Sequence, residues 1–479
     1  MTDGDFGLLS PVSASPAVAA LTGDHAVIAA ILDVEASWAA VLEDAGLVPA
    51  GSAAVVAEAA DAGSYDMLSV AERAQGGGNP VIPLLGDLRA RVRELDTTGI
   101  GAGKAVHTSL TSQDVLDSAL MLLASRTVTA LLVDVKGTTT ALATLAEQHA
   151  DTLCVGRSLT QHALPYTFGL KAAQWFQSVA AAAARLESLE LPVQFGGAGG
   201  TLASATKLTA GSASTPFDLA DALAAKLGLE PAPAPWHTNR LPITALGDGL
   251  AALVDSFGKI AADLLFLSRP EVAELGEPLA AGRGVSSAMP QKQNPVLSVL
   301  VRSAALQAPG PASQLHLAAA TFNDERPDGA WHSEWPALRQ LLALALGAAG
   351  HLLELTEGLR VFPEAMRRNL EISGPLLLSE GVAAGVAPLL GEDGKQKLQG
   401  VVDETLKAPA AEQSRIYTKL LREAVPADKL SDAELDALLD PASYLGEAQE
   451  ISRRILAAYP HFSAPAENPG NPSKGAIRG

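Results

Sequence analysis

The chain of 479 residues is long enough for about three domains of ordinary size, and it carries a net charge of −19 with a pI near 4.9. This acidity argues against a nucleic-acid-binding surface, which needs a concentrated basic face. Hydrophobic residues make up 48% of the chain but aromatic residues only 4%, which favours closely packed helices and predicts an all-α fold. With one cysteine, no N-terminal signal pattern and apolar runs shorter than a membrane span, we expect a cytoplasmic protein without membrane contact.

Two helices are predicted in the N-terminal part of the chain, at 24–47 and 81–95, where apolar residues recur at helical spacing. A glycine run at 75–80 separates them. Such a run is either a plain connector or a binding loop in which backbone can approach a ligand, and the pattern leaves both open.

The segment 107–117, His-Thr-Ser-Leu-Thr-Ser-Gln-Asp-Val-Leu-Asp, leads into a long helical pattern. Thr111 and Ser112 are placed to cap the helix that follows, which is an ordinary structural role. A pair of hydroxyls at a helix N-terminus also suits a carboxylate ligand, and the two roles are compatible.

Long helical patterns then follow at 115–148, 168–189, 246–267, 296–319 and 337–359. Several are two to three times the usual helix length, which predicts an elongated bundle. The stretches 179–184 and 341–349 are apolar nearly all round, so we expect one chain not to cover them and predict burial between subunits.

The segment 156–171, which runs into the second of these patterns, contains Arg157 and Gln161. If the segment is helical, these two side chains lie on one face at i and i+4. They would then be able to bind a substrate carboxylate together.

The segment 282–295, Gly-Arg-Gly-Val-Ser-Ser-Ala-Met-Pro-Gln-Lys-Gln-Asn-Pro, is the most specific signal in the chain. Glycines flank paired hydroxyls, and a lysine and an asparagine follow before the next helix. The pattern predicts a mobile loop that offers a hydroxyl, backbone N–H groups and one cation to an oxyanion. The alternative is a flexible polar loop without function.

After Pro363 the charged fraction rises and the helical patterns shorten, so we predict domains at 1–113, 114–363 and 364–462, with a disordered tail at 463–479. The sequence shows no phosphate-binding loop, dinucleotide fingerprint or zinc-ligand spacing. We therefore expect no metal and no cofactor.

The three segments at 111–117, 156–165 and 286–295 resemble, in order, the signature segments of the fumarase/aspartase superfamily. The likeness covers most of the chain. The segments 79–84, 194–197 and 234–238 make it most similar to the bacterial 3-carboxy-cis,cis-muconate cycloisomerases. The resemblance implies a three-domain fold with a central helical bundle, a homotetramer with active sites shared between subunits, and a small tricarboxylate substrate.

The resemblance also implies roles for individual residues. Ser286 would transfer the proton, assisted by Lys292, and its alkoxide would need stabilisation by the N–H groups of the loop. The expected substrate-binding residues are Asn79, His107, Thr111, Ser112, Arg157, Gln161, Arg240, Ser287, Met289 and Asn294. For several of these, a plain polar role at the surface or between helices is the alternative.

Two positions depart from most superfamily members in a correlated way. Leu159 stands where a histidine often assists the departing group, and Val299 stands where a glutamate supports that histidine. A leaving group that is itself a carboxylate needs no such acid, because a carboxylate with a pKa of about 4 departs unprotonated. This observation favours intramolecular lactone formation, giving 4-carboxymuconolactone in aromatic catabolism.

Other departures concern the substrate assignment. Gln293 stands where a basic residue is common, Ser109 and Leu110 replace a Gly-Ala pair, and Leu241 stands where aspartate is frequent. The alternatives are another lyase, such as an adenylosuccinate or argininosuccinate lyase, and a catalytically silent structural relative.

Overall fold

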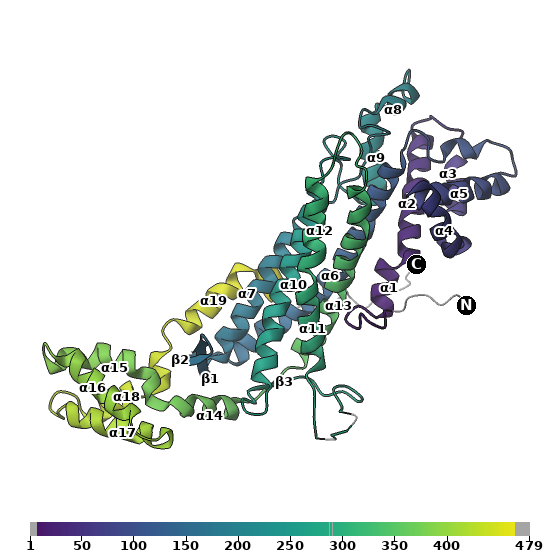
Figure 1. Cartoon of the computed structure of the whole chain (residues 1–479). Coiled ribbons are helices and arrows are strands. Elements are labelled where there is room, and N and C mark those ends of the chain that lie inside the picture. Colours follow the sequence, from purple (N-terminus) through teal and green to yellow (C-terminus); the bar gives the residue numbers. More distant parts are fainter. Residues whose placement is uncertain (1–6, 287, 290, 465–479) are drawn as a thin grey trace, which may run out of the picture. The chain divides into compact units, whose positions relative to one another are not determined.

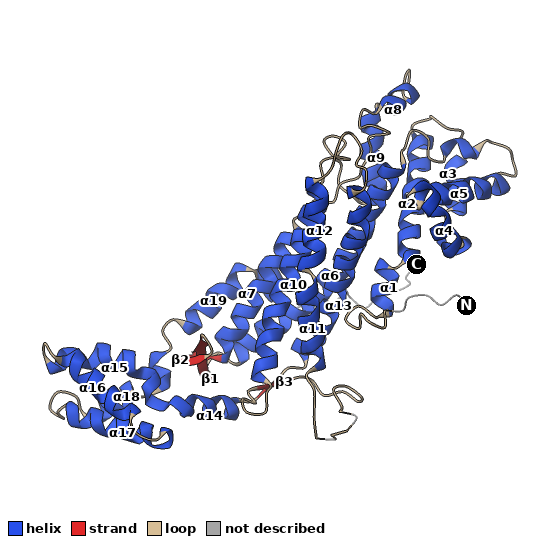
Figure 2. Ribbon diagram, viewed as in Figure 1, coloured by secondary structure: helices blue, strands red, loops and turns tan. Residues whose placement is uncertain are grey.

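The computed structural model describes residues 7–286, 288–289 and 291–464, and helices dominate this part of the chain (Figure 1). Within it, strands are confined to two short antiparallel pairs (Figure 2). The all-α fold expected from the composition is confirmed. Of the tail expected to be disordered, 463–479, Ser463 instead ends a helix (Pro460–Ser463), and 465–479 lies outside the described residues.

The chain divides into two compact units whose boundaries fall inside long helices. Unit 1 comprises Met1–Val135, Ala182–Gly258 and Leu300–Leu352. Unit 2 comprises Lys136–Ala181, Lys259–Val299 and Leu353–Gly479. The three expected domains were delimited by proline and glycine breaks and by composition along the chain, whereas these two units are delimited by contacts between residues. The three-domain division therefore stays a prediction.

In unit 1, helix α2 (Asp24–Asp44) supplies much of the N-terminal core. Its Trp38 and Leu42 are fully buried and pack with Leu223 of α9. The predicted helices are confirmed as α2 and α5 (Val81–Leu95). The other short helices of this unit are α1 (Pro16–Thr22), α3 (Ser52–Ala59), η1 (Ala62–Ser64), α4 (Met67–Gly77), η2 (Ala102–Ala105), α8 (Ala203–Leu208) and α9 (Pro216–Leu227).

The long helices are α6 (Ser112–Gln148), α7 (Phe168–Glu187), α10 (Leu241–Leu267), α11 (Val296–Gln307), α12 (Pro309–Ala320) and α13 (Ala330–Glu357). The single helix predicted over 296–319 is wrong. The chain breaks there at Ala308, because Pro309 lacks the N–H that would continue the α11 ladder and instead starts α12. Helix α13 begins upstream of the predicted start and accommodates Pro336 in its interior.

The two stretches expected at subunit contacts are largely covered by the chain itself. Residues 341–349 are buried apart from the half-buried Ala343, and 179–184 are buried or half-buried. The reason given for burial between subunits therefore fails.

By length and composition alone, four helical stretches in the described part of the chain are apolar enough to cross a membrane. In two of them, Ser112–Gln148 and Ala330–Glu357, more than half of the most apolar part is buried within the chain.

The segment expected to be helical around Arg157 is a β-hairpin. Strand β1 (Leu153–Ser158) pairs antiparallel with β2 (Gln161–Thr167). Arg157 and Gln161 thus lie on different strands, and the predicted helical face does not exist. Val155 of β1 is fully buried against Leu370 and Leu377, so contacts more than 200 residues away in sequence stabilise the strand.

A second strand pair joins β3 (Leu275–Gly276) to β4 (Arg360–Val361) in unit 2. After it, a group of short helices packs around Val386, Tyr417 and Leu421. Its members, with the helices that flank them, are α14 (Pro363–Ser373), η3 (Gly374–Leu378), α15 (Ser379–Val386), η4 (Ala387–Leu390), α16 (Gly394–Leu406), α17 (Ala410–Ala424), α18 (Asp432–Leu438), η5 (Pro441–Tyr444), α19 (Ala448–Ala458) and α20 (Pro460–Ser463).

Candidate active site

The loop between β3 and α11 is closed at its base by four residues, Arg283, Gly284, Gln293 and Asn294, which we call the loop neck. Asn294 donates from its backbone N and from Nδ2 to the Gly284 carbonyl, at 2.8 and 3.0 Å. Gln293 donates from Nε2 to the Arg283 carbonyl at 2.9 Å. Gly284 has φ +66°, and a Cβ there would lie 2.3 Å from the Asn294 carbonyl oxygen, so glycine is required. Asn294, expected to hold a substrate carboxylate, thus has part of its amide engaged in closing the loop.

Ser286 lies beyond the neck, with its hydroxyl oxygen facing backbone N–H groups of the same loop. Its Oγ accepts from the N–H of Met289 at 3.1 Å and from that of Ala288 at 3.4 Å. Donors aimed at one oxygen stabilise negative charge on it. Lys292 is exposed and has no ion pair among the described residues, which leaves its ammonium available to an anion. Met289 is also exposed, and Ser287 lies outside the described residues.

His107 in unit 1 is fixed by a carboxylate from a distant helix. The fully buried Glu35 of α2 accepts from the His107 backbone N–H at 2.9 Å and lies 2.7 Å from Nδ1. His107 has φ +60°, an uncommon conformation that these two bonds help to hold. With Nδ1 engaged, Nε2 is the ring nitrogen left for a substrate.

The start of α6 is organised by Asp114. This buried carboxylate accepts N–H groups from Thr111 at 3.0 Å, Gly196 at 2.9 Å and Gly197 at 3.0 Å. Burial raises the pKa of Asp114 to about 7, while the three N–H donors act to lower it. Ser112 is the first residue of α6 and is half-buried.

Thr111 has a cationic neighbour that the sequence did not reveal. Its Oγ1 accepts from Arg326 Nη2 at 2.7 Å. The Arg326 side chain therefore lies at the N-terminus of α6, where it adds its charge to the positive end of the helix dipole. Such a place favours an anionic ligand.

Arg240 is enclosed in unit 1 between two carboxylates. It donates to both oxygens of Asp117, at 2.7 and 3.0 Å, and to both oxygens of Glu334, at 2.7 to 3.1 Å. All three side chains are at most 1% exposed. Burial raises the pKa of Glu334. The guanidinium is thus satisfied within the chain, a structural role, and its role in substrate binding stays a prediction.

Asn79 also has a local structural role. Its Oδ1 accepts from the N–H groups of Val81 at 3.1 Å and Ile82 at 3.3 Å, at the start of α5. These bonds satisfy two of the donors that a helix N-terminus leaves free. The glycine run before it ends α4, with Gly78 at φ +70°.

Arg157 of the hairpin pairs with Glu274 in unit 2. Its Nη2 lies 2.5 Å from Oε1 of Glu274, which also accepts from Asn369 Nδ2 at 2.7 Å. The hairpin tip beyond Arg157 is exposed. Leu159 there is 93% exposed with φ +49°, and Gln161 is exposed beside it.

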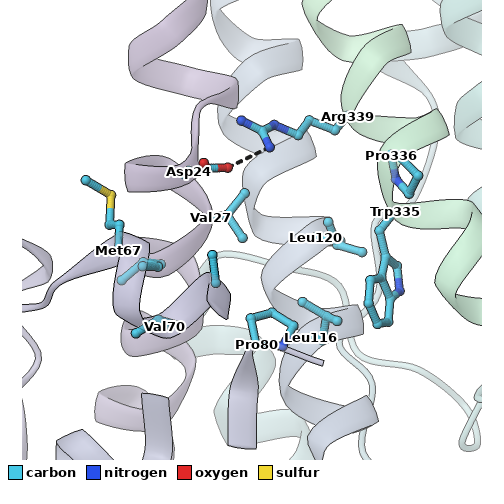
Figure 3. A pocket seen from close by; sticks show the side chains of 12 residues that line it. Asp24, Val27, Met67, Val70, Pro80, Leu116, Leu120, Trp335, Pro336 and Arg339 are labelled. Carbon is cyan, nitrogen blue, oxygen red and sulfur yellow. Dashed lines mark hydrogen bonds and ion pairs between the residues drawn. The ribbon is translucent and has the colours of Figure 1, made fainter. Parts of the chain in front are cut away.

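The predicted site residues therefore fall into two groups. Asn79, His107, Thr111, Ser112 and Arg240 belong to unit 1, whereas the hairpin and loop residues belong to unit 2. Within unit 1, a separate cavity of about 270 Å³ is lined mostly by apolar side chains and edged by the Arg339–Asp24 ion pair (Figure 3). None of the predicted site residues lines that cavity.

Sequence reasoning missed the carboxylates and the cation that hold the predicted residues in place. Glu35, Glu274 and Arg326 each contact a predicted site residue from 72 or more positions away. No local spacing signals such pairs. The acidic residues Asp114 and Asp117 did lie inside the recognised segment 107–117 and were identifiable from it.

Similarity to known proteins extends over almost the whole chain. The family described as Lyase matches residues 31–310. Nitrosuccinate lyase of Streptomyces davaonensis is 42% identical over 472 residues, covering 96% of this chain and 97% of that protein. A 3-carboxy-cis,cis-muconate cycloisomerase of Bradyrhizobium diazoefficiens is 36% identical, with coverages of 94% and 97%. The crystal structure of 3-carboxy-cis,cis-muconate lactonizing enzyme from Pseudomonas putida superimposes with a TM-score of 0.85 at 33% identity, covering 96% of this chain and 100% of that one.

Proposed function

The chain belongs to the lyase family of the fumarase/aspartase superfamily, and from this premise we propose that the enzyme adds or removes a proton and a weakly basic anion across a carbon–carbon bond beside a carboxylate. The observation that carries the proposal is the convergence of two backbone N–H groups on Ser286 Oγ. As an alkoxide, Ser286 takes a proton from the carbon that bears the carboxylate in the elimination direction, and the leaving group is on the adjacent carbon. The resulting aci-carboxylate then expels the leaving group with its bonding electron pair, and a double bond forms.

The leaving group is inferred from what the site lacks. Leu159 and Val299 occupy the positions of the acid and its supporting glutamate in related enzymes, and neither can donate a proton. A carboxylate or a nitrite ion is a stable anion and departs without one. Both relatives compared above have names consistent with such a group: a lyase acting on nitrosuccinate would release nitrite, and a lactone opens to a carboxylate.

Nitrosuccinate is our first candidate substrate, since the relative named for it is 42% identical over nearly all of both chains. The departures at Gln293 and Leu241 from the cycloisomerase pattern agree with this choice. The second candidate is 3-carboxy-cis,cis-muconate, closed to 4-carboxymuconolactone, because two relatives named for that reaction are 36% and 38% identical and the matching crystal structure covers 96% of this chain.

The test is a parallel assay of the purified enzyme on four compounds: nitrosuccinate, 3-carboxy-cis,cis-muconate, adenylosuccinate and argininosuccinate. Nitrite release and ultraviolet absorbance report the first two reactions. Turnover of either that Ser286→Ala abolishes supports the proposal. Turnover only of the two amine-releasing substrates would refute the leaving-group argument, and no turnover of any would favour a catalytically silent relative.

A further inference from the structure

A cavity of about 210 Å³ lies in unit 2 at the base of the Ser286 loop. Gln293 and Asn294 of the loop neck line it on one side, and Glu277 and Arg360 line it on another. Ser286 and Lys292 do not line it. The cavity is therefore separate from the residues assigned to proton transfer, yet it shares two residues with the loop neck.

Arg360 is held in one orientation beside this cavity. Its Nε donates to the Glu277 carbonyl at 2.8 Å, and its guanidinium lies 5.6 Å from the ring centre of Phe362. Gly276, its partner in the β3–β4 pair, leaves room for the guanidinium, because a Cβ there would lie 2.8 Å from Nη2. A guanidinium fixed in this way loses little conformational entropy when it binds a ligand.

The charge of Arg360 has no carboxylate partner among the described residues, unlike that of other partly buried arginines in unit 2. Arg157 pairs with Glu274, and Arg283 pairs with Glu354. Glu277, whose carbonyl accepts from Arg360, uses its carboxylate at the start of α11, where it accepts from Leu297 N at 3.1 Å and from Ser298 N at 2.7 Å and Oγ at 2.6 Å. A half-buried cation without a counter-charge favours an anion beside it.

We propose that this cavity binds a small carboxylate through the two Nη atoms of Arg360. A planar carboxylate matches the fork of a guanidinium and carries one charge, whereas a phosphate would bring up to two charges next to Glu277 with only one cation to balance them. Because Gln293 and Asn294 border the cavity and also form the loop neck, an occupant packs against the neck and stabilises it. The bound carboxylate thus makes the Ser286 loop more resistant to local opening.

Equilibrium dialysis of the full chain with radiolabelled succinate tests the binding. Arg360→Gln should remove one succinate site per chain, with affinity at that site reduced about 10- to 100-fold. Arg269→Gln is the matched control, since Arg269 also lies over an aromatic ring, that of Phe266 at 5.5 Å, but does not line the cavity.

An unchanged number of bound succinates in Arg360→Gln overturns the proposal, as does displacement of that succinate by an equal concentration of inorganic phosphate. If Arg360→Gln fails to fold by circular dichroism, Arg360→Lys decides: it keeps the charge but not the fork, so its succinate affinity should fall several-fold, and full affinity overturns the proposal.

Limited trypsin digestion tests the effect on the loop, because Lys292 lies directly before the loop neck and is exposed. Succinate should slow cleavage after Lys292 in the wild-type protein by several-fold more than in Arg360→Gln. Equal protection in both proteins would place the stabilising succinate elsewhere and overturn the inference. Neither experiment depends on turnover, so a wrong substrate assignment would leave their outcome unaffected.

Discussion

Among the described residues, Ser286 makes no hydrogen bond to a histidine or a carboxylate, and its hydroxyl oxygen instead accepts from backbone N–H groups. The N–H groups of Ala288 and Met289 point at Oγ, so this orientation needs no rearrangement when charge develops there. Preorganised donors of this kind are more effective in a site that excludes water. Lys292 is exposed, so its ammonium is free to move toward an anion bound at the loop and to stabilise the negative charge there.

Replacing Ser286 with Ala should lower kcat by about 10²–10⁴-fold, because it removes the proton-transfer group. The effect should fall on kcat more than on KM, since the substrate-binding residues remain. Steady-state kinetics on the accepted substrate measure it, with Ser188→Ala, an exposed serine on another segment, as the control. A Ser286→Ala enzyme with full kcat would remove Ser286 from the mechanism.

Leu159 combines two unfavourable features, an apolar side chain that is 93% exposed and a left-handed backbone at φ +49°. We expect Leu159→His not to raise kcat, because a weakly basic leaving group needs no acid and the supporting glutamate position is Val299. Histidine tolerates the left-handed region better than leucine, so the melting temperature should stay level or rise slightly. Because the side chain at position 159 is exposed in the single chain, a histidine there would not be buried, and its imidazole needs no partner within that chain.

Kinetics and thermal melting of Leu159→His decide the matter, with Leu159→Gly as a control that relieves the strain without adding an acid. A several-fold rise in kcat for the histidine variant alone would show that an acid is useful at this position. The choice between a weakly basic leaving group and an amine would then be open again.

At the scale of elements, Arg240 connects three helices of unit 1, since it precedes α10 and binds Asp117 of α6 and Glu334 of α13. Its guanidinium also lies 4.9 Å from the Trp236 ring and 5.0 Å from the Phe322 ring. Arg240→Met should lower the free energy of unfolding by about 3–5 kcal/mol, because it leaves two buried carboxylates without a cation. Urea unfolding measures the loss, with Arg185→Met on the exposed side of α7 as the control.

The pH dependence of that loss follows from the sign of the pKa shift. Burial already raises the pKa of Glu334, and removal of the arginine would raise it further. The folded variant then binds more protons than the unfolded chain, so its stability rises as the pH falls. The deficit relative to wild type should therefore shrink between about pH 7 and about pH 5. A deficit that is small or independent of pH would contradict the role given to this cluster.

The sequence predicted elements well where local periodicity determines them, as for the helix at Val81–Leu95, whose bounds agree with the structure. The sequence-based prediction was wrong where packing against residues distant in sequence determines the secondary structure. The hairpin β1–β2 depends on Leu370 and Leu377, which cover Val155, and no window around Arg157 contains that information. Pro309 signals the break between α11 and α12, but apolar residues continue at helical spacing on both sides of it, so the sequence pattern predicted one helix.

The candidate site shows the same division. The serine of the loop and the asparagine of its neck lie within one continuous segment, so the motif alone placed them together. The partners of His107 and Thr111, namely Glu35 and Arg326, come from elements 72 and 215 positions away. Tertiary structure is needed to find them.

At the scale of the whole molecule, the predicted homotetramer now depends on different residues from those that first suggested it. Residues 341–349 are covered by one chain, but other apolar side chains on the long helices are not. In unit 1, Val133 of α6 is 68% exposed, Leu306 of α11 is 69% exposed and Leu317 of α12 is 59% exposed. Exposed apolar residues on helix after helix indicate a surface that another copy covers.

We predict that light scattering after size exclusion gives about four times the chain mass of 49.1 kDa, and that Leu306→Glu combined with Leu317→Glu yields smaller species with little activity. A carboxylate at each position would be desolvated in the contact without a partner, which opposes assembly. Ile372→Glu is the matched control, because Ile372 is 68% exposed but lies on α14, outside the long helices. It should leave both mass and kcat unchanged. A wild-type protein that is a stable, fully active monomer would contradict the prediction and would require each chain to hold a complete site of its own.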